Sequence, residues 1–385
     1  MFPDLSYIFH YFFGTPPDNA LAIVKTFGLF LAIAILSAAW LLEKELRRKE
    51  REGLLKPVKE KITVGEGPQT GEILTNALVG FLVGFKLVFI MGAFDLFRMD
   101  PAGILFSGQG SLPGGFIGGI LAGGYRYWYK SRHKLPKPEI RTVEVYPHQR
   151  IGDITILSAV SGVIGAKLFD ALEHMDQLLS DPIGTLFSGG GLAIYGGLIV
   201  AFIVMYIYFK KKGIQPIHVM DAVAPALIIA YGIGRIGCQL SGDGDWGIVN
   251  AAAIPSWWFF PDWLWAFDYP HNVLNEGVRI EGCEWAYCSR LAEPVYPTPV
   301  YETLLAFVIG GILWILRKRM QIAGMLFFTY LVFNGAERFL IEKIRVNIRY
   351  DWGALQPTQA EIISTALVII GISGLIILWR RHRNN

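Results

Sequence analysis

Residues 217–247 read IHVMDAVAPALIIAYGIGRIGCQLSGDGDWG, an apolar run that ends in a charged, glycine-rich segment. The run at 217–237 is long enough to cross the hydrocarbon core of a bilayer as a helix, for which about 20 residues are needed. Arg235 lies near its far end, and placing a charged side chain inside a bilayer costs about 2.5–3.5 kcal/mol on insertion scales. Arg235 therefore predicts a functional site that takes an anion.

The whole chain has the composition of a membrane protein. Of its 385 residues, 53% are hydrophobic and 17% are charged, and the mean hydropathy is +0.41; a soluble protein of this length would be more charged. Apolar runs long enough to span a bilayer lie near 21–42, 73–94, 114–129, 152–172, 191–209, 217–237, 299–316, 323–341 and 360–379. We therefore expect an all-α polytopic membrane protein with about nine transmembrane helices, in which residues 1–385 form a single integral membrane domain.

Basic residues predict which loops face the cytoplasm. They gather at 43–63, 130–150, 210–212, 317–319 and 380–383. The positive-inside rule places such loops in the cytoplasm. The N-terminus is then expected outside and the C-terminus inside, and the long connection at 238–298 is expected to form a periplasmic cap.

The expected cap combines tryptophans with prolines and acids, a composition suited to the headgroup level of a membrane. Its tryptophans are Trp246, Trp257, Trp258, Trp263, Trp265 and Trp285. It also contains Cys283 and Cys288. A disulfide between them is permitted outside the cytoplasmic membrane, and a pair of free, inert thiols is the alternative.

One helical hairpin occurs twice in the sequence. Residues 71–115 align with residues 152–196 without a gap, at a constant offset of 81. We therefore predict two repeated hairpins, at 71–130 and 152–212. Both enter the membrane from the same side, which makes this a parallel repeat.

The connection within each hairpin contains the block Asp-Pro-x-Gly-x-Leu-Phe-Ser-Gly-x-Gly, at 100–110 and again at 181–191. Proline and clustered glycines resist a continuous helix, so we expect a broken helix or a re-entrant turn near the outer surface. Backbone N–H groups freed in such a turn are able to face an anionic ligand. Other glycines, such as Gly114 and Gly118, are expected to bring helices into close contact.

Further ionisable side chains lie in or beside apolar runs, namely Lys86, Lys167, Asp221, Arg338 and Glu342. Arg338 and Glu342 are four residues apart and share one helix face. An ion pair that hides both charges from lipid is one interpretation, and a ligand role for Arg338 is the other. Because guanidinium groups match phosphate oxygens in geometry, arginines on two separate helices favour an anion site.

Five segments carry a resemblance to a known family, in the order in which that family has them. They lie at 181–199, 221–225, 234–243, 296–302 and 338–345. On these motifs the chain resembles the prolipoprotein diacylglyceryl transferases, well over residues 150–350 and weakly over 21–45. Residues 71–130 look like an additional hairpin, which accounts for nine spans where that family commonly has seven.

The resemblance implies an enzyme of the bacterial inner membrane that uses no cofactor or metal and has its active site at the outer face. The implied reaction transfers the diacylglyceryl group of phosphatidylglycerol to the cysteine thiol of a prolipoprotein signal peptide, with glycerol phosphate leaving. The partners are then these two substrates and the bilayer, and no nucleic acid. The implied catalytic residues are Tyr195, Arg235, Asp243, Arg338 and Glu342, and the implied substrate-binding residues are Lys167, Gly196, Gly197, Asn334 and the same two arginines.

Some positions near the expected site depart from the family pattern. Asp243 stands where members usually have Glu, and Cys238 stands where they have Asn. Tyr195 stands where many members carry the His proposed as general base, and Asn334 replaces a tyrosine. The resemblance therefore leaves the group that takes the thiol proton unassigned.

Part of this chemistry follows from the residues themselves. A cysteine thiol has a pKa of about 8.5, and only its thiolate attacks carbon well. Displacement at glycerol C3 gives the departing phosphate more negative charge, which two guanidinium groups would stabilise in the transition state. The seven histidines form no ligand-spaced pair, so no metal site is indicated. Tyr195 is a weak general base because the reference pKa of tyrosine is about 10, and a packing role is its alternative.

Two other functions are compatible with parts of the sequence. A transporter or lipid flippase is suggested by the parallel repeat and the intramembrane charges, although the arginines lie outside the repeat. A catalytically inactive, lipid-binding relative is suggested by the missing His. A lipid-transfer assay with phosphatidylglycerol separates the transferase from both alternatives.

Overall fold

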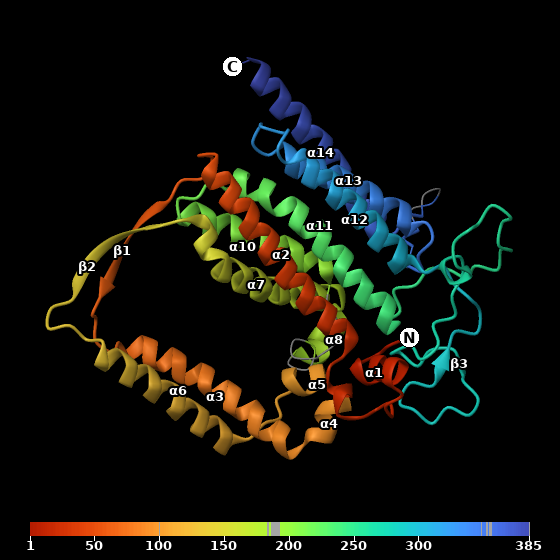
Figure 1. The fold of residues 1–385 in the computed structure, drawn as a ribbon, viewed down its shortest axis with the longest axis horizontal. Helices are drawn as coiled ribbons and strands as arrows, with labels where there is room; N and C mark the ends of the chain where they lie inside the picture. The colour runs from red at the N-terminus through yellow and green to blue at the C-terminus, as the bar shows by residue number, and fades with distance from the viewer. Residues whose placement is uncertain are drawn as a thin grey trace. The chain divides into compact units, whose positions relative to one another are not determined.

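The computed structural model describes residues 1–99, 101–182, 185, 193–347, 349–351, 353 and 356–384. Within them the chain is mostly helical and divides into two compact units. The first unit consists of Met1–Leu55 and Gln215–Asn385, and the second of Lys56–Ile214 (Figure 1). That the whole chain acts as a single membrane domain stays a prediction.

The first unit is built around α11. Its elements are α1 (Leu5–Phe13), η1 (Ala20–Ile23), α2 (Thr26–Arg51), α11 (Pro216–Ser241), η3 (Asp262–Leu264), β3 (Val278–Arg279), β4 (Ser289–Arg290), α12 (Thr298–Leu316), α13 (Met325–Glu342) and α14 (Gln359–Asn384). α11 packs against α2, α12 and α13, and α13 also packs against α14 (Figure 1). Ile228, Leu313 and Leu326 form an almost fully buried core where α11, α12 and α13 meet.

Asp221 joins α11 to two other helices. Its carboxylate accepts hydrogen bonds from the backbone N–H groups of Gly324 (2.8 Å) and Phe327 (3.0 Å) at the start of α13. It also lies 3.6 Å from the ammonium of Lys49 on α2. The first N–H groups of a helix lack partners inside the helix and favour a carboxylate. Asp221 therefore fixes the start of α13 against α11.

The second unit contains the two repeated hairpins. Its elements are β1 (Val58–Val64), α3 (Thr70–Gly92), α4 (Phe94–Met99), α5 (Pro101–Phe106), α6 (Leu112–Arg132), β2 (Glu139–Val145), η2 (Pro147–Arg150), α7 (Ile151–Glu173), α8 (Met175–Ser180) and α10 (Ile194–Lys211). The bounds of α3 and α7 are related by the offset of 81 found in the sequence, and so are those of α4 and α8. The two hairpins therefore repeat in secondary structure as well as in sequence.

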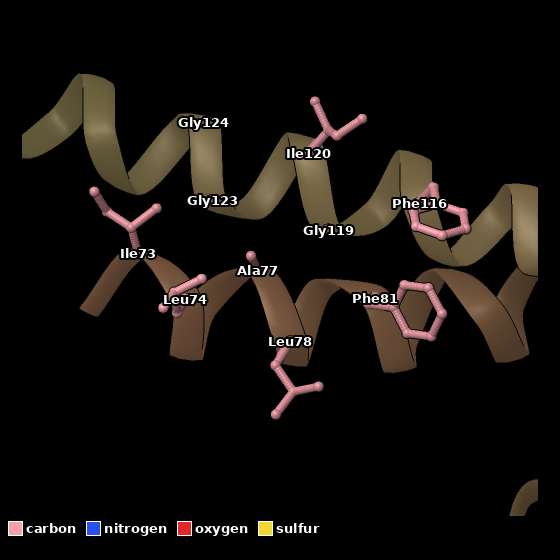
Figure 2. Close-up of a pocket in the computed structure, with 10 residues that line it drawn as sticks. All are labelled: Ile73, Leu74, Ala77, Leu78, Phe81, Phe116, Gly119, Ile120, Gly123 and Gly124. Atoms are coloured by element: carbon pink, nitrogen blue, oxygen red, sulfur yellow. The ribbon is translucent and has the colours of Figure 1, made fainter. Parts of the chain in front are cut away.

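Glycines bring the two long helices of each hairpin into close contact. A Cβ on Gly84 would lie 2.2 Å from the carbonyl oxygen of Gly114, and a Cβ on Gly165 would lie 2.7 Å from that of Gly196. The packing role predicted for such glycines is confirmed at these positions. An apolar groove of about 530 Å³ remains between α3 and α6, and Figure 2 shows it lined by Ala77 of α3 and by glycines of α6.

The connection in the first hairpin is a broken helix, as the sequence predicted. α4 and α5 are separate short helices, and residues 107–111 lead from α5 into α6. The Lys86 ammonium donates to the carbonyl oxygens of Ile104 (2.8 Å), Ser107 and Gln109 (2.9 Å), and so holds this turn together. Most of the matching block at 181–191, including its three consecutive glycines at 189–191, lies outside the described residues.

An antiparallel ribbon of two strands lies in two of the connections that are rich in basic residues. β1 pairs with β2 along the whole length of both strands. Each strand has four β-branched residues among its seven, and such residues favour a strand. Glu60 of β1 lies 2.6 Å from Arg150 and 3.0 Å from Lys212, so basic residues of these loops bind the ribbon to the ends of α7 and α10. This ribbon was not predicted from the sequence.

Nine of the described helices have 18 or more residues, and each overlaps one of the nine expected spans. Seven of the nine, including α2, α11 and α12, are long and apolar enough to cross a membrane. α6 is less apolar because it contains six glycines and Arg126, and α13 carries Glu337, Arg338 and Glu342 within 18 residues. The polytopic, mostly helical architecture is confirmed, and the number of spans stays a prediction.

The segment between α11 and α12 is folded but mostly irregular. Trp246, Tyr269, Leu291 and Val295 form its buried core. Cys283 and Cys288 are joined in a disulfide, which decides between the two possibilities that the sequence left open. That this segment is a cap on the outer side of the membrane stays a prediction.

Candidate active site

Three helices of the first unit bring charged residues together. α11 supplies Arg235 near its end, α12 supplies Glu302 in its second turn, and α13 supplies Arg338 and Glu342 in its last turns. Arg345, just after α13, joins them. The apolar residues of the same helices pack in the core. The charged side chains contact one another, and we call Arg235, Glu302, Arg338, Glu342 and Arg345 the charged cluster.

Glu302 lies at the centre of the charged cluster. Its side chain has no exposed surface. Its oxygens lie 2.5 Å from Nε of Arg235, 3.3 Å from Nη1 of Arg338 and 3.0 Å from Nη1 of Arg345. A buried carboxylate needs such partners because desolvating an unpaired charge is costly. Glu302 therefore positions three guanidinium groups at once.

A glycine-rich turn after α11 adds Asp245 to the charged cluster. The residue that caps the end of α11 is Gly242, whose φ of 64° is in the left-handed region that favours glycine. The turn directs Asp245 back to the helices, where its carboxylate pairs with Arg235 and with Arg345. Burial acts to raise the pKa of Asp245, but the guanidinium groups of Arg235 and Arg345 outweigh it and lower this pKa to about 2.

Arg338 and Glu342 form an ion pair at 3.0 Å, which was one of the two interpretations of their spacing. The formal charges of the charged cluster balance. Its three arginines are Arg235, Arg338 and Arg345, and the three carboxylates that pair with them are Asp245, Glu302 and Glu342. Among the described residues, Arg235 makes its ion pairs through Nε and Nη1, and Arg338 through Nη1 and Nη2. Further N–H groups, on Nη2 of Arg235 and on Nε of Arg338, are available to an anion.

Asp243 belongs to the same turn, but no described ion pair joins it to an arginine. It accepts a long hydrogen bond from the backbone N–H of Asp245 (3.4 Å), and burial together with the charge of Asp245 raises the pKa of its carboxyl. Cys238, Asp243 and Asp245 offer three donor atoms within 4.8 Å of one another. The two guanidinium groups bound to Asp245 oppose a cation at this point, so we assign no metal to it.

The other residues expected in the site belong to the second unit, apart from Asn334. Tyr195 is the second residue of α10 and is half-buried, and Lys167 lies on α7. Gly196 and Gly197 are buried against α7, where a Cβ on Gly196 would lie 2.2 Å from that of Phe169. Their contribution to the site stays a prediction.

Asn334 lies on α13, one turn before Arg338. Its side-chain amide donates to the hydroxyl of Tyr330 over 3.4 Å. This weak bond ties Asn334 to its own helix. A role in binding substrate stays a prediction for this residue as well.

Two polar groups beside the charged cluster lack partners within the described part of the chain. Glu337 on α13 is 4% exposed, and neither of its carboxylate oxygens has a hydrogen bond or an ion pair there. The hydroxyl of Tyr231 on α11 is buried and also unpartnered, and the ring of Tyr231 lies 5.1 Å from the guanidinium of Arg235. Most buried polar groups in proteins are paired, so these two mark a place where a bound group is expected.

Four residues at this site were not predicted from the sequence, namely Glu302, Asp245, Glu337 and Arg345. Glu302 is the one Asp, Glu, Lys or Arg in α12, so the rule that singled out Arg235 would also have found it. Asp243 and Asp245 lie in the same turn, but the turn directs only the side chain of Asp245 to the arginines. The sequence does not reveal this direction. Glu337 was hidden by its neighbour Arg338, from which a helix turns it by about 100°.

A family model described as prolipoprotein diacylglyceryl transferase matches residues 128–377. The chain belongs to this family. The matched region includes the whole charged cluster, from Arg235 to Arg345. It leaves out α3, α4, α5 and most of α6, so the first hairpin lies outside what the family model describes.

Individual members of the family differ in how much of this chain they match. The phosphatidylglycerol--prolipoprotein diacylglyceryl transferases of Lysinibacillus sphaericus and Staphylococcus aureus are 28% identical over 232 residues and 30% identical over 234 residues. Each match covers 60% of this chain, and 77% and 75% of the respective relative. The enzyme of the same name from Leptospira interrogans is 24% identical over 409 residues, 98% of this chain and 95% of the relative, so its matched span includes residues 71–130.

Proposed function

We propose that this transferase moves the diacylglyceryl group of phosphatidylglycerol to the thiol of a prolipoprotein cysteine and releases glycerol phosphate. The observation that carries the proposal is the charged cluster, in which arginines from α11 and α13 are held by buried carboxylates while keeping N–H groups for an anion. Guanidinium groups bind phosphate oxygens well because their planar donors match them. A phosphatidylglycerol headgroup supplies such a phosphate.

In the reaction the cysteine thiol first loses its proton. The thiolate attacks C3 of the diacylglyceryl glycerol, a C–S bond forms, and the C–O bond to the phosphate breaks. The electron pair of that bond leaves with the phosphate, whose negative charge increases. Arg235 and Arg338 oppose this charge, and because it grows toward the transition state, they stabilise that state more than the bound lipid.

The carboxylates hold the arginines in position before the lipid binds. Glu302 touches Arg235, Arg338 and Arg345, so it sets the spacing of the groups that receive the phosphate. Asp245 binds Arg235 and Arg345 from the turn after α11. Guanidinium groups fixed before the lipid binds need little rearrangement during the reaction, which is the main source of electrostatic catalysis.

The test uses the purified protein in nanodiscs that contain phosphatidylglycerol, together with a synthetic peptide that carries a lipoprotein cysteine. Wild type should raise the peptide mass by one diacylglyceryl group and release glycerol phosphate. Arg235→Ala and Arg338→Ala should each lower the rate by about 10²–10³-fold, as removal of one preorganised donor does. Lysine at either position should not restore the rate, because it lacks the planar fork.

Arg47→Ala is the matched control for these variants. Arg47 lies on α2, its side chain is 54% exposed, and it pairs only with Glu43 among the described residues. Its rate should equal that of wild type. Peptide modification by either cluster variant at the wild-type rate would contradict the assignment of the phosphate to these arginines.

We further propose that the active site faces the outer side of the inner membrane, with the N-terminus outside and the C-terminus in the cytoplasm. The basic loops support this orientation. So does the Cys283–Cys288 disulfide, because such bonds persist in oxidising compartments and it follows the same turn that carries Asp245.

Thiol labelling tests the orientation. Cysteines introduced at the exposed positions Gln109 and Glu276 should react with a membrane-impermeant reagent added to cells whose outer membrane is permeable, and cysteines at Lys56 and Lys137 should not. Cys238 is buried and the other two cysteines are disulfide-bonded, so the introduced thiol is the one that reacts. The opposite pattern would place the site in the cytoplasm.

A further inference from the structure

The proposed function, on which this inference rests, requires a group that accepts the proton of the cysteine thiol. A thiol has a pKa of about 8.5, so only a small fraction is thiolate at neutral pH without help. Tyr195 stands where many family members carry a His, and a tyrosine hydroxyl is a poor proton acceptor at this pH. The chain therefore needs a base other than the one the family resemblance suggests.

The paired carboxylates of the charged cluster do not meet this need. Asp245, Glu302 and Glu342 are each bound to at least one arginine within the described residues. A carboxylate so bound is a weaker base, because the guanidinium stabilises its charged form. Proton transfer to one of them would also break the contacts that hold the arginines in place.

Glu337 differs from these three in its surroundings. It is 4% exposed, and neither of its oxygens has a hydrogen bond or an ion pair with any described residue. It is the residue before Arg338, and Glu302, Arg338, Arg235 and Arg345 lie near enough to act on its charge. A buried carboxyl group with two unused oxygens is costly to maintain, so a bound donor is expected there.

We propose that Glu337 is the general base of the transfer. Its carboxylate accepts the proton of the lipoprotein cysteine as the thiolate forms the C–S bond with glycerol C3. The C–O bond to the phosphate breaks in the same displacement, and glycerol phosphate leaves with the electron pair. The proton held by Glu337 passes to water when the products leave, which returns the carboxylate.

Other titratable groups face the same place from the helices packed around it. They are Tyr231 and Arg235 on α11, Glu302 on α12, Tyr330 and Arg338 on α13 itself, and Arg345 after it. The arginines remain charged over the working pH range. The pH dependence expected below is therefore assigned to Glu337 through a comparison of variants, and not from the wild-type profile alone.

The experiment compares Glu337→Gln with wild type on two peptides that differ in one atom, cysteine against selenocysteine. A selenol is already ionised at neutral pH and needs no base. With the cysteine peptide, Glu337→Gln should lower kcat/KM by about 10²–10³-fold, within the range that a general base contributes. With the selenocysteine peptide the two proteins should differ by less than about tenfold.

Arg338→Ala is the contrasting variant, because its defect concerns the phosphate. It should be slow with both peptides. With cysteine, the rate of Glu337→Gln should also rise about tenfold per pH unit toward the thiol pKa of about 8.5, whereas wild type should rise less steeply. If Glu337→Gln does not insert, Glu337→Asp, which keeps a carboxylate one carbon shorter, should show the same difference between peptides to a smaller degree.

Three results would overturn the assignment or its basis. Wild-type activity of Glu337→Gln with the cysteine peptide would remove Glu337 from the reaction. Equal losses with both peptides in a correctly inserted protein would make it a structural residue. Failure of wild type to transfer lipid to either peptide would instead refute the proposed function, which separates the two hypotheses.

Discussion

Replacing Glu302 with glutamine tests the charged cluster at its centre. The substitution keeps the shape of the side chain and removes one negative charge, so three arginines are left with two carboxylates. Glu302 has no exposed surface, and the side chains of Arg235, Arg338 and Arg345 are only 10%, 17% and 9% exposed. Water can therefore do little to replace the lost charge.

The expected loss follows from the burial of these groups. Removing one partner of a buried ion pair costs about 3–5 kcal/mol, because the remaining charge is left unpaired. Asp245 and Glu342 still bind the three arginines, so we expect the lower end, about 3 kcal/mol of unfolding free energy. That corresponds to more than about a hundredfold in the unfolding constant, at 1.36 kcal/mol for each factor of ten.

The assay is reversible unfolding in mixed micelles near neutral pH, with two comparisons. Glu43→Gln is the matched control, because its ion pair with Arg47 joins side chains that are 33% and 54% exposed, and its loss should stay below about 1 kcal/mol. Adding Arg345→Gln to Glu302→Gln removes the single excess positive charge, because two arginines then face two carboxylates. The double variant should then lose at least about 1 kcal/mol less than the sum of the single losses.

Either of two results would refute this reasoning. A loss for Glu302→Gln as small as that of Glu43→Gln would mean that the buried carboxylate is not needed to offset the arginines. Strictly additive losses in the double variant would mean that Glu302 and Arg345 act independently, despite the 3.0 Å that separates them.

Three other predictions concern single positions. Tyr195→Phe should lose most transfer activity at unchanged expression if its hydroxyl is one of the catalytic groups that the family resemblance implies; an active variant would make Tyr195 a packing residue. Lys167→Ala should lower activity more than Lys86→Ala at matched membrane levels, because only Lys167 belongs to the hairpin that the family shares, and equal losses would contradict this. Asp245 has a lowered pKa, so the stability that it contributes should be complete above pH 4 and lost toward pH 2, whereas Asp245→Asn should lack this acid-dependent part; the measurement is stability against pH for both proteins.

The helices could be predicted well because their signal is local. Each expected span needed only a run of apolar residues, and nine long helices overlap those runs. The strand ribbon was missed because the charge of its loops was given more weight than the β-branched residues within them. Charge and strand structure occur together at Glu60, which lies in β1 and whose carboxylate binds the ribbon to Arg150 and Lys212.

The candidate site could be predicted only in part. Arg235 and Arg338 stand out because an arginine in an apolar helix needs a reason, and both lie in the charged cluster. Their partners depend on which helix faces meet and on where a turn points, which are properties of the fold. For this reason Asp245 was not distinguished from Asp243, and the central place of Glu302 was not foreseen.

An enzyme that alkylates thiols has to leave its own thiols unmodified. This sequence has three cysteines, and two of them are oxidised to the Cys283–Cys288 disulfide. The third, Cys238, lies 3.8 Å from Nη1 of Arg235, close to where the lipid phosphate is proposed to bind, but it is only 5% exposed. Discrimination between the substrate cysteine and the enzyme's own cysteine therefore rests on access to the lipid carbon, and a substitution that opened the packing around Cys238 would favour self-inactivation.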